Sequence, residues 1–181
     1  MNKIILSLIA IVAVSAVGTY IFLQEQDTPV ATSTEAITSQ EVKEQAILEV
    51  NLDEQGRALH GNDPVAYFEA GQSVLGTENL NLSWNKATWQ FSSVENKSKF
   101  EQNPEKFIPA NGGFCTFGVA LGKKFDGDPN VWHIKEGQLY VFLNSDIKNK
   151  FMQDEDGNIE KANNFWPQIK DKSPEDLETG M

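Results

Sequence analysis

Two stretches of alternating apolar and polar residues constrain the fold of this 181-residue chain most strongly. In the first stretch, Leu80, Leu82 and Trp84 alternate with polar residues as far as Asn85, and the alternation resumes at Trp89. A period of two is typical of a half-buried β-strand, and two such runs joined by a short turn predict an antiparallel hairpin. We therefore expect one hairpin to turn around Asn85.

The second stretch has the same pattern farther along the chain. Val131 and His133 precede a turn that contains Gly137, and Leu139 and Val141 follow it. Glycine adopts the left-handed backbone that tight hairpin turns require, so a second hairpin is expected around Gly137. Hairpins followed by short helices predict a small α+β domain with a single core, and they exclude an all-helical bundle or a doubly wound parallel sheet.

Helix signals follow each predicted hairpin. Ser92 and Glu95 match the S-x-x-E capping box, which predicts that Ser92 caps a helix running to Asn103 and stopping before Pro104. Asn144 is an N-cap residue type and predicts the start of a second helix.

A third helix is predicted near the C-terminus. We expect the acidic run 154–157 to break the second helix and Pro167 to end the third, whose apolar residues have helical spacing. These apolar residues are Ile159, Ala162, Phe165 and Trp166. No internal repeat is visible in the sequence.

The first 23 residues predict a membrane anchor. Lys3 precedes 20 uncharged residues, Ile4 to Leu23, which are long enough to span a bilayer as one helix. The basic flank predicts a cytoplasmic N-terminus, with the rest of the chain on the periplasmic side of a bacterial inner membrane. The alternative is a signal peptide cleaved after Ala16, which would release the protein as a secreted domain.

The rest of the chain divides by composition. Residues 24–46 are rich in Gln, Glu, Thr and Ser and predict a disordered linker, residues 47–169 the folded domain, and residues 170–181 a polar tail. The net charge of −11 argues against binding to nucleic acid. Cys115 is the only cysteine, which excludes an intrachain disulfide and a zinc site built on several thiolates.

Several motifs in order resemble the YHS-domain family. They cover the chain from about Ala58 to Trp166 and read G-x-D-P-V-A-Y-F, W-x-x-A-T-W-x-F, F-x-x-N-P-E-K-F, G-G-F-C, D-P-x-V-W, G-x-L-Y and N-F-W-P. The resemblance implies a small extracytoplasmic domain. Members of this family that handle metal, often copper, carry three cysteines where this chain has Ala66, Ser92 and Asn96, and none of these three offers the soft ligand that Cu(I) prefers.

Four residues are candidates for ligand binding. Cys115 is the only strong nucleophile, and the glycines before it predict a thiol in a tight turn or at a helix start near aromatic residues. The structural interpretation makes Cys115 a buried core residue, which is common for free cysteine. His133 could pair with Cys115 to bind a metal, but an ordinary surface or hydrogen-bonded histidine is the favoured interpretation of both His133 and His60. Tyr67 and Trp132 belong to an aromatic set that could fill the core or line a pocket.

We therefore expect a monomeric, membrane-tethered YHS-type domain that is not an enzyme and has no catalytic residues. It would bind a small ligand or a protein partner, and no resident cofactor is predicted. The first alternative is a copper or other transition-metal accessory protein that uses Cys115 and His133. The second alternative is a thiol-dependent redox protein.

Overall fold

The computed structural model describes residues 49–178 of the chain. The predicted anchor, linker and first domain residues lie outside this range. Among the described residues, no helix is both long and apolar enough to cross a membrane. The elements are, in order, η1 Leu59–Gly61, α2 Ala66–Glu69, β1 Thr77–Trp84, β2 Ala87–Phe91, α3 Val94–Gln102, η2 Pro104–Lys106, η3 Ala110–Gly113, α4 Thr116–Ala120, β3 Asp128–Lys135, β4 Gln138–Phe142, α5 Ser145–Phe151, η4 Met152–Asp154, α6 Glu155–Ile169 and α7 Pro174–Glu178.

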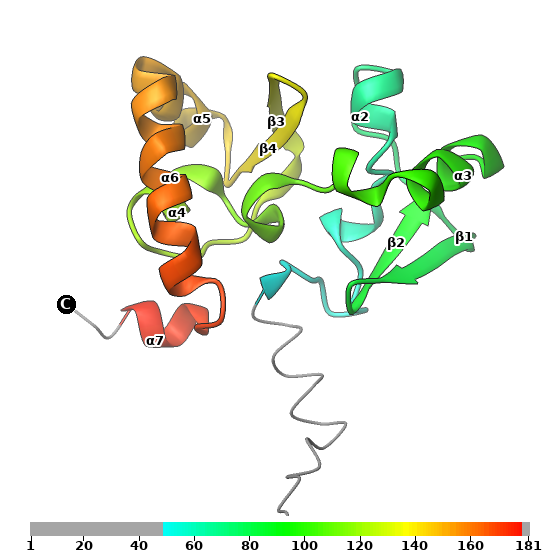
Figure 1. The fold of residues 1–181 in the computed structure, drawn as a ribbon, viewed down its shortest axis with the longest axis horizontal. Helices are drawn as coiled ribbons and strands as arrows, with labels where there is room; N and C mark the ends of the chain where they lie inside the picture. Colours follow the sequence, from blue (N-terminus) through cyan, green and yellow to red (C-terminus); the bar gives the residue numbers. More distant parts are fainter. Residues whose placement is uncertain (1–48, 179–181) are drawn as a thin grey trace, which may run out of the picture. The chain divides into compact units, whose positions relative to one another are not determined.

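Both predicted hairpins are present, and with the helices they make an α+β fold (Figure 1). Strand β1 pairs with β2 and β3 pairs with β4, each antiparallel in its own two-stranded sheet. The first turn has two left-handed residues, Asn85 at φ 47° and Lys86 at φ 63°, and the second has Glu136 at 51° and Gly137 at 79°. Two consecutive positive φ angles are the geometry of the tight turn that matches the twist of paired strands.

The two hairpin–helix units form a structural repeat, although no internal repeat was predicted from the sequence. Strand β1 begins at Thr77 and β3 at Asp128, 51 residues later, and both pairings are irregular after the first bridge. The ring of Phe91 lies 5.3 Å from Phe100 at 59°, and the equivalent Phe142 lies 4.8 Å from Phe151 at 57°. Few residues other than these phenylalanines are shared, so the repeat is preserved in packing and backbone rather than in sequence.

The repeat extends to the segment before each hairpin. His60 (φ 50°) in η1 and Asn111 (φ 54°) in η3 both have left-handed backbone and are followed by a left-handed glycine. The backbone N–H of Asp63 donates to Val74 over 2.8 Å, and that of Cys115 donates to Phe125 over 2.9 Å. Asp63 and Cys115 therefore occupy equivalent positions in the two halves.

Two helix boundaries differ by one residue or more from those predicted. The N-cap of α3 is Ser93, not Ser92, because the Ser93 hydroxyl accepts from the Asn96 backbone N–H. The Ser92 hydroxyl instead donates to Asp63. The prediction for α5 is confirmed, since the Asn144 side chain accepts from the Ile147 backbone N–H.

Helix α6 is longer at both ends than predicted. The helix begins within the acidic run, at Glu155, because the Asp154 side chain caps it by accepting from the Gly157 backbone N–H. Pro167 does not end it either and lies within its last turns. Its side chain is exposed, so the hydrogen bond that proline removes is lost on the solvent face. The predicted polar tail includes α7, and Leu177 packs against a buried cluster around Phe114.

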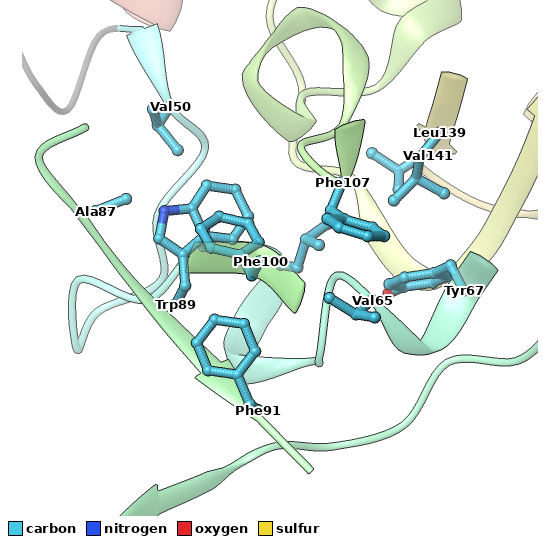
Figure 2. Packing of buried hydrophobic residues seen from close by; sticks show 12 residues of the cluster. Val50, Val65, Tyr67, Ala87, Trp89, Phe91, Phe100, Phe107, Leu139 and Val141 are labelled. Carbon is cyan, nitrogen blue, oxygen red and sulfur yellow. The ribbon is translucent and has the colours of Figure 1, made fainter. Parts of the chain in front are cut away.

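The largest buried cluster joins the first hairpin to the second strand of the other one (Figure 2). Phe100 lies at its centre, with ring centroids 5.2 Å from Trp89 and 6.5 Å from Phe107. Leu139 and Val141 of β4 belong to the same cluster. Helix α6 packs along α4 and covers the second half, whereas the first half has no covering helix of this length among residues 49–178 (Figure 1).

Candidate functional site

A buried carboxylate, that of Asp63, organises the hydrogen bonds around Ser92 and Asn96. Asp63 is fully buried, and its Oδ2 accepts from the Ser92 backbone N–H (2.8 Å), the Ser92 hydroxyl (2.6 Å) and the Asn96 amide (2.7 Å). Its Oδ1 accepts from the Val65 backbone N–H over 2.9 Å. Four donors thus satisfy the carboxyl oxygens, as buried polar atoms require. Ser92 and Asn96 are therefore parts of a structural hydrogen-bond cluster.

Cys115 lies at the equivalent position of the second half and is also buried. It precedes α4, which confirms the predicted location at a helix start. Its side chain packs with Tyr140, Phe142 and Phe151 and is 1% exposed. The pKa of the Cys115 thiol is raised, mainly because burial disfavours the thiolate. Hydrogen bonds from the backbone N–H groups of Gly118, Leu143 and Phe117 lower the pKa, but they do not outweigh the effect of burial. A buried thiol with a raised pKa is a poor nucleophile at neutral pH.

Because Cys115 is the only thiol, its reactivity can be measured without interference. We expect a thiol reagent to modify the native protein at neutral pH at least about 100-fold more slowly than the urea-unfolded chain, since the reagent requires both access and a thiolate. Native and unfolded rates of similar size would contradict the buried position and would favour an activated cysteine.

His133 is not joined to Cys115 by a hydrogen bond in the described part of the chain. Its Nε2 lies 2.9 Å from Oε1 of Glu155 at the start of α6, an ion-pair distance without hydrogen-bond geometry. Lys135 contacts the other oxygen of Glu155 at 3.4 Å. The surroundings of His133 are therefore a charged cluster between β3 and α6.

Tyr67 and Trp132 are brought together, with ring centroids 5.3 Å apart in an edge-to-face contact. The Tyr67 hydroxyl donates to the Pro129 carbonyl over 2.9 Å, and burial raises the pKa of Tyr67 to about 12. This pair links α2 to β3. Tyr67 belongs to the largest buried cluster, and Trp132 packs against that cluster. A ligand-binding role for these two residues, as for Cys115 and His133, stays a prediction.

A pocket of about 370 Å³ lies elsewhere, and none of these four residues lines it. Three of the four tryptophans, Trp84, Trp89 and Trp166, do line it. The complete lining is Glu49, Val50, Trp84, Asn85, Trp89, Glu105, Ile108, Pro109, Ala110, Asn111, Gly112, Gln138, Trp166 and Lys170. Its walls therefore come from the first described residues, the first hairpin, the segment between the two halves, the start of β4 and the C-terminal end of α6.

Backbone conformation shapes the pocket where the two halves join. Gly112 has φ 62°, and a Cβ atom there would collide with the carbonyl oxygen of Glu49. The Asn51 backbone N–H donates to the Gly112 carbonyl over 2.9 Å, which holds the two segments together. The glycine of the G-G-F-C motif thus allows two parts of the protein to approach each other.

A buried lysine supports the α6 wall of the pocket. Lys124 is 3% exposed, and its Nζ donates to the carbonyls of Lys170 (2.6 Å) and Lys172 (2.7 Å) at the end of α6. The same Nζ lies 5.4 Å from the centre of the Trp166 ring. Burial lowers the pKa of Lys124 to about 8. Lys124 therefore positions Trp166 and Lys170, both of which line the pocket.

This lowered pKa predicts a dependence of stability on pH. Between pH 8 and 10.5 the unfolded chain holds the lysine proton while the folded protein has lost it, so the free energy of unfolding rises with pH. The rise is expected to reach up to about 3 kcal/mol across this window. Urea unfolding at pH 7.5 and 9.5 gives the change in the free energy of unfolding with pH for the wild type and for Lys124→Met. The difference between these two changes is the contribution of Lys124, because the other titrating groups are present in both proteins. Equal pH slopes in both proteins would contradict the assignment.

No group of three or more His, Cys, Asp or Glu side chains within residues 49–178 is arranged to hold a metal ion. Comparison of the chain with protein-family models, with curated proteins and with solved structures finds no match in any of the three. The resemblance to YHS-domain proteins therefore stays a prediction.

Proposed function

We propose that this protein is a non-enzymatic binding module and that a small ligand occupies the pocket lined by Trp84, Trp89 and Trp166. The main observation that supports this proposal is the pocket itself. Its volume of about 370 Å³ is that of a small-molecule site. Its walls combine tryptophan and aliphatic side chains with an almost equal share of polar groups, which could orient a ligand. Aromatic side chains provide large contact areas at little entropic cost.

The chemistry of the reactive side chains favours binding over catalysis. The Cys115 thiol is buried with a raised pKa. His60 Nε2 lies 2.8 Å from Asp126, and His133 lies 2.9 Å from Glu155. Among residues 49–178, neither histidine and no carboxylate is hydrogen-bonded to the Cys115 thiol, which has only backbone partners. The Ser92 hydroxyl does reach a carboxylate, that of Asp63, but this carboxylate is fully buried and takes part in the structural hydrogen-bond cluster.

The remaining parts of the proposal rest on the sequence. The charge-free N-terminal run supports a membrane tether with the domain on the extracytoplasmic side, and the ordered motifs support a YHS-type domain. Metal handling and thiol redox chemistry through Cys115 are the alternatives, and no contact among residues 49–178 favours either of them.

Intrinsic fluorescence tests the proposal, because the pocket holds most of the tryptophans. In the full-length variant Trp132→Phe, all three remaining indoles line the pocket. This variant is titrated with three phenyl probes of similar size and different charge: phenethylamine, 2-phenylethanol and 3-phenylpropanoate. We expect a saturable change with at least one probe, which Trp166→Ala abolishes in a protein whose circular dichroism is unchanged.

Two results would overturn the proposal. One is the absence of any saturable change up to about 10 mM, because even a weak fragment site saturates in this range. The other is binding, followed by calorimetry in the wild type, that Trp132→Phe removes and Trp166→Ala leaves intact. That second result would favour the Tyr67–Trp132 pair as the ligand site.

A further inference from the structure

We infer that the pocket selects a small organic cation, namely a protonated amine attached to an apolar or aromatic body. This inference rests on the proposed function and names the class of ligand for the same site. Three properties of the pocket support it: the unpaired carboxylate of Glu105, the amide oxygen of Gln138 and the indole rings.

One carboxylate that lines the pocket forms no ion pair with any described residue. Glu49 and Lys170 both line the pocket and neutralise each other, with 3.0 Å between Oε1 and Nζ. Glu105 also lines it, is exposed, and forms no ion pair with any described residue. A ligand entering past Glu105 therefore meets a carboxylate that no described cation pairs with, and this favours a cationic ligand at that side of the pocket.

The pocket offers a hydrogen-bond acceptor to a bound N–H group. Gln138 lines the pocket, and its amide nitrogen donates to the carbonyls of Ile108 (3.0 Å) and Leu139 (3.3 Å). Its amide oxygen has no hydrogen-bond partner among residues 49–178 and is left to accept from a ligand. An ammonium group supplies three N–H donors and no acceptor.

The indole rings suit the same ligand. Tryptophan is the aromatic side chain that attracts cations most strongly through its ring face. Trp166 already has Lys124 Nζ 5.4 Å from its ring centre. Trp84 is half-buried and has no cation over its ring in the described part of the chain, so the ammonium group is expected over Trp84 and the apolar body beside Trp89.

The test compares the three phenyl probes by affinity in the full-length Trp132→Phe protein at pH 7, where phenethylamine is a cation. Phenethylamine is expected to bind at least about 10-fold more tightly than 2-phenylethanol, with 3-phenylpropanoate weakest. Glu105→Gln should weaken phenethylamine binding about 3- to 10-fold and leave 2-phenylethanol unchanged. Glu101→Gln is the matched control, because Glu101 is exposed on α3 but does not line the pocket, and it should change neither affinity.

The outcomes separate this inference from the proposed function. If 2-phenylethanol or 3-phenylpropanoate binds as tightly as phenethylamine, and Trp166→Ala still abolishes binding, the pocket is a ligand site but not a cation site. If Glu105→Gln and Glu101→Gln have the same effect on phenethylamine, the role assigned to Glu105 is wrong. If no probe binds, both the inference and the proposed function fail.

Discussion

Replacing Asp63 with alanine is expected to lower the free energy of unfolding by about 3–5 kcal/mol. The carboxylate is fully buried and accepts four hydrogen bonds, three of them from Ser92 and Asn96. Alanine would leave these donors unpaired in the interior and open a small cavity. Urea unfolding of the full-length protein, followed by tryptophan fluorescence, measures the loss.

Asp146→Ala is the matched control for this prediction. Asp146 is exposed in the first turn of α5, where an acidic side chain interacts only with the helix dipole. Its removal should cost less than about 1 kcal/mol. If Asp63→Ala costs no more than Asp146→Ala, the hydrogen-bond cluster does not stabilise the fold, and Ser92 and Asn96 need another explanation.

The second large effect is expected at the two equivalent phenylalanines of the repeat. Phe100→Ala and Phe151→Ala should each lower the free energy of unfolding by about 3–5 kcal/mol, because each ring is fully buried at the centre of an aromatic cluster. The loss should be of similar size in both, since Phe91 and Phe142 pack on them in the same geometry. Urea unfolding of the two variants provides the comparison.

Phe165→Ala serves as the control for these core substitutions. Phe165 is 39% exposed on α6, and its truncation should cost about 1 kcal/mol or less. A loss at Phe165 as large as that at Phe100 or Phe151 would contradict the assignment of the two cluster centres.

The hairpins could be predicted because their signals are local. Alternating residues report directly which face of a strand is buried, and Asn85 and Gly137 lie at turn positions that require left-handed backbone. The Asn144 cap was found for the same reason, since a capping side chain reaches only three residues along the chain.

The errors arose where tertiary contacts decide between local options. Ser92 and Ser93 both fit a helix start, and the buried Asp63, 29 residues earlier, takes the Ser92 hydroxyl and leaves the cap to Ser93. Asp154 turned an apparent break into a helix start by capping α6. The repeat was missed because its two halves keep the positions of Phe100 and Phe151 while most other residues differ.

The pocket could not be predicted from local patterns in the sequence, because distant segments of the chain form it. Its residues come from segments as distant as Glu49 and Lys170, and no local pattern joins them. The sequence predicts that aromatic residues could line a pocket and makes Trp132 a candidate, whereas in the structure Trp166 lines the pocket and Trp132 does not. The amide oxygen of Gln138 is left as an acceptor because the amide nitrogen donates to Ile108, 30 residues earlier, and this contact exists only in the folded protein.

The most direct test of ligand binding in this pocket observes each indole separately. In a ¹H–¹⁵N correlation spectrum of the full-length protein, the four indole N–H signals are assigned by single Trp→Phe substitutions and followed while phenethylamine is added. Binding in the pocket predicts that the signals of Trp84, Trp89 and Trp166 shift with one common Kd, while that of Trp132 stays in place. A shift confined to Trp132, or no saturable shift in any of the four, would contradict it.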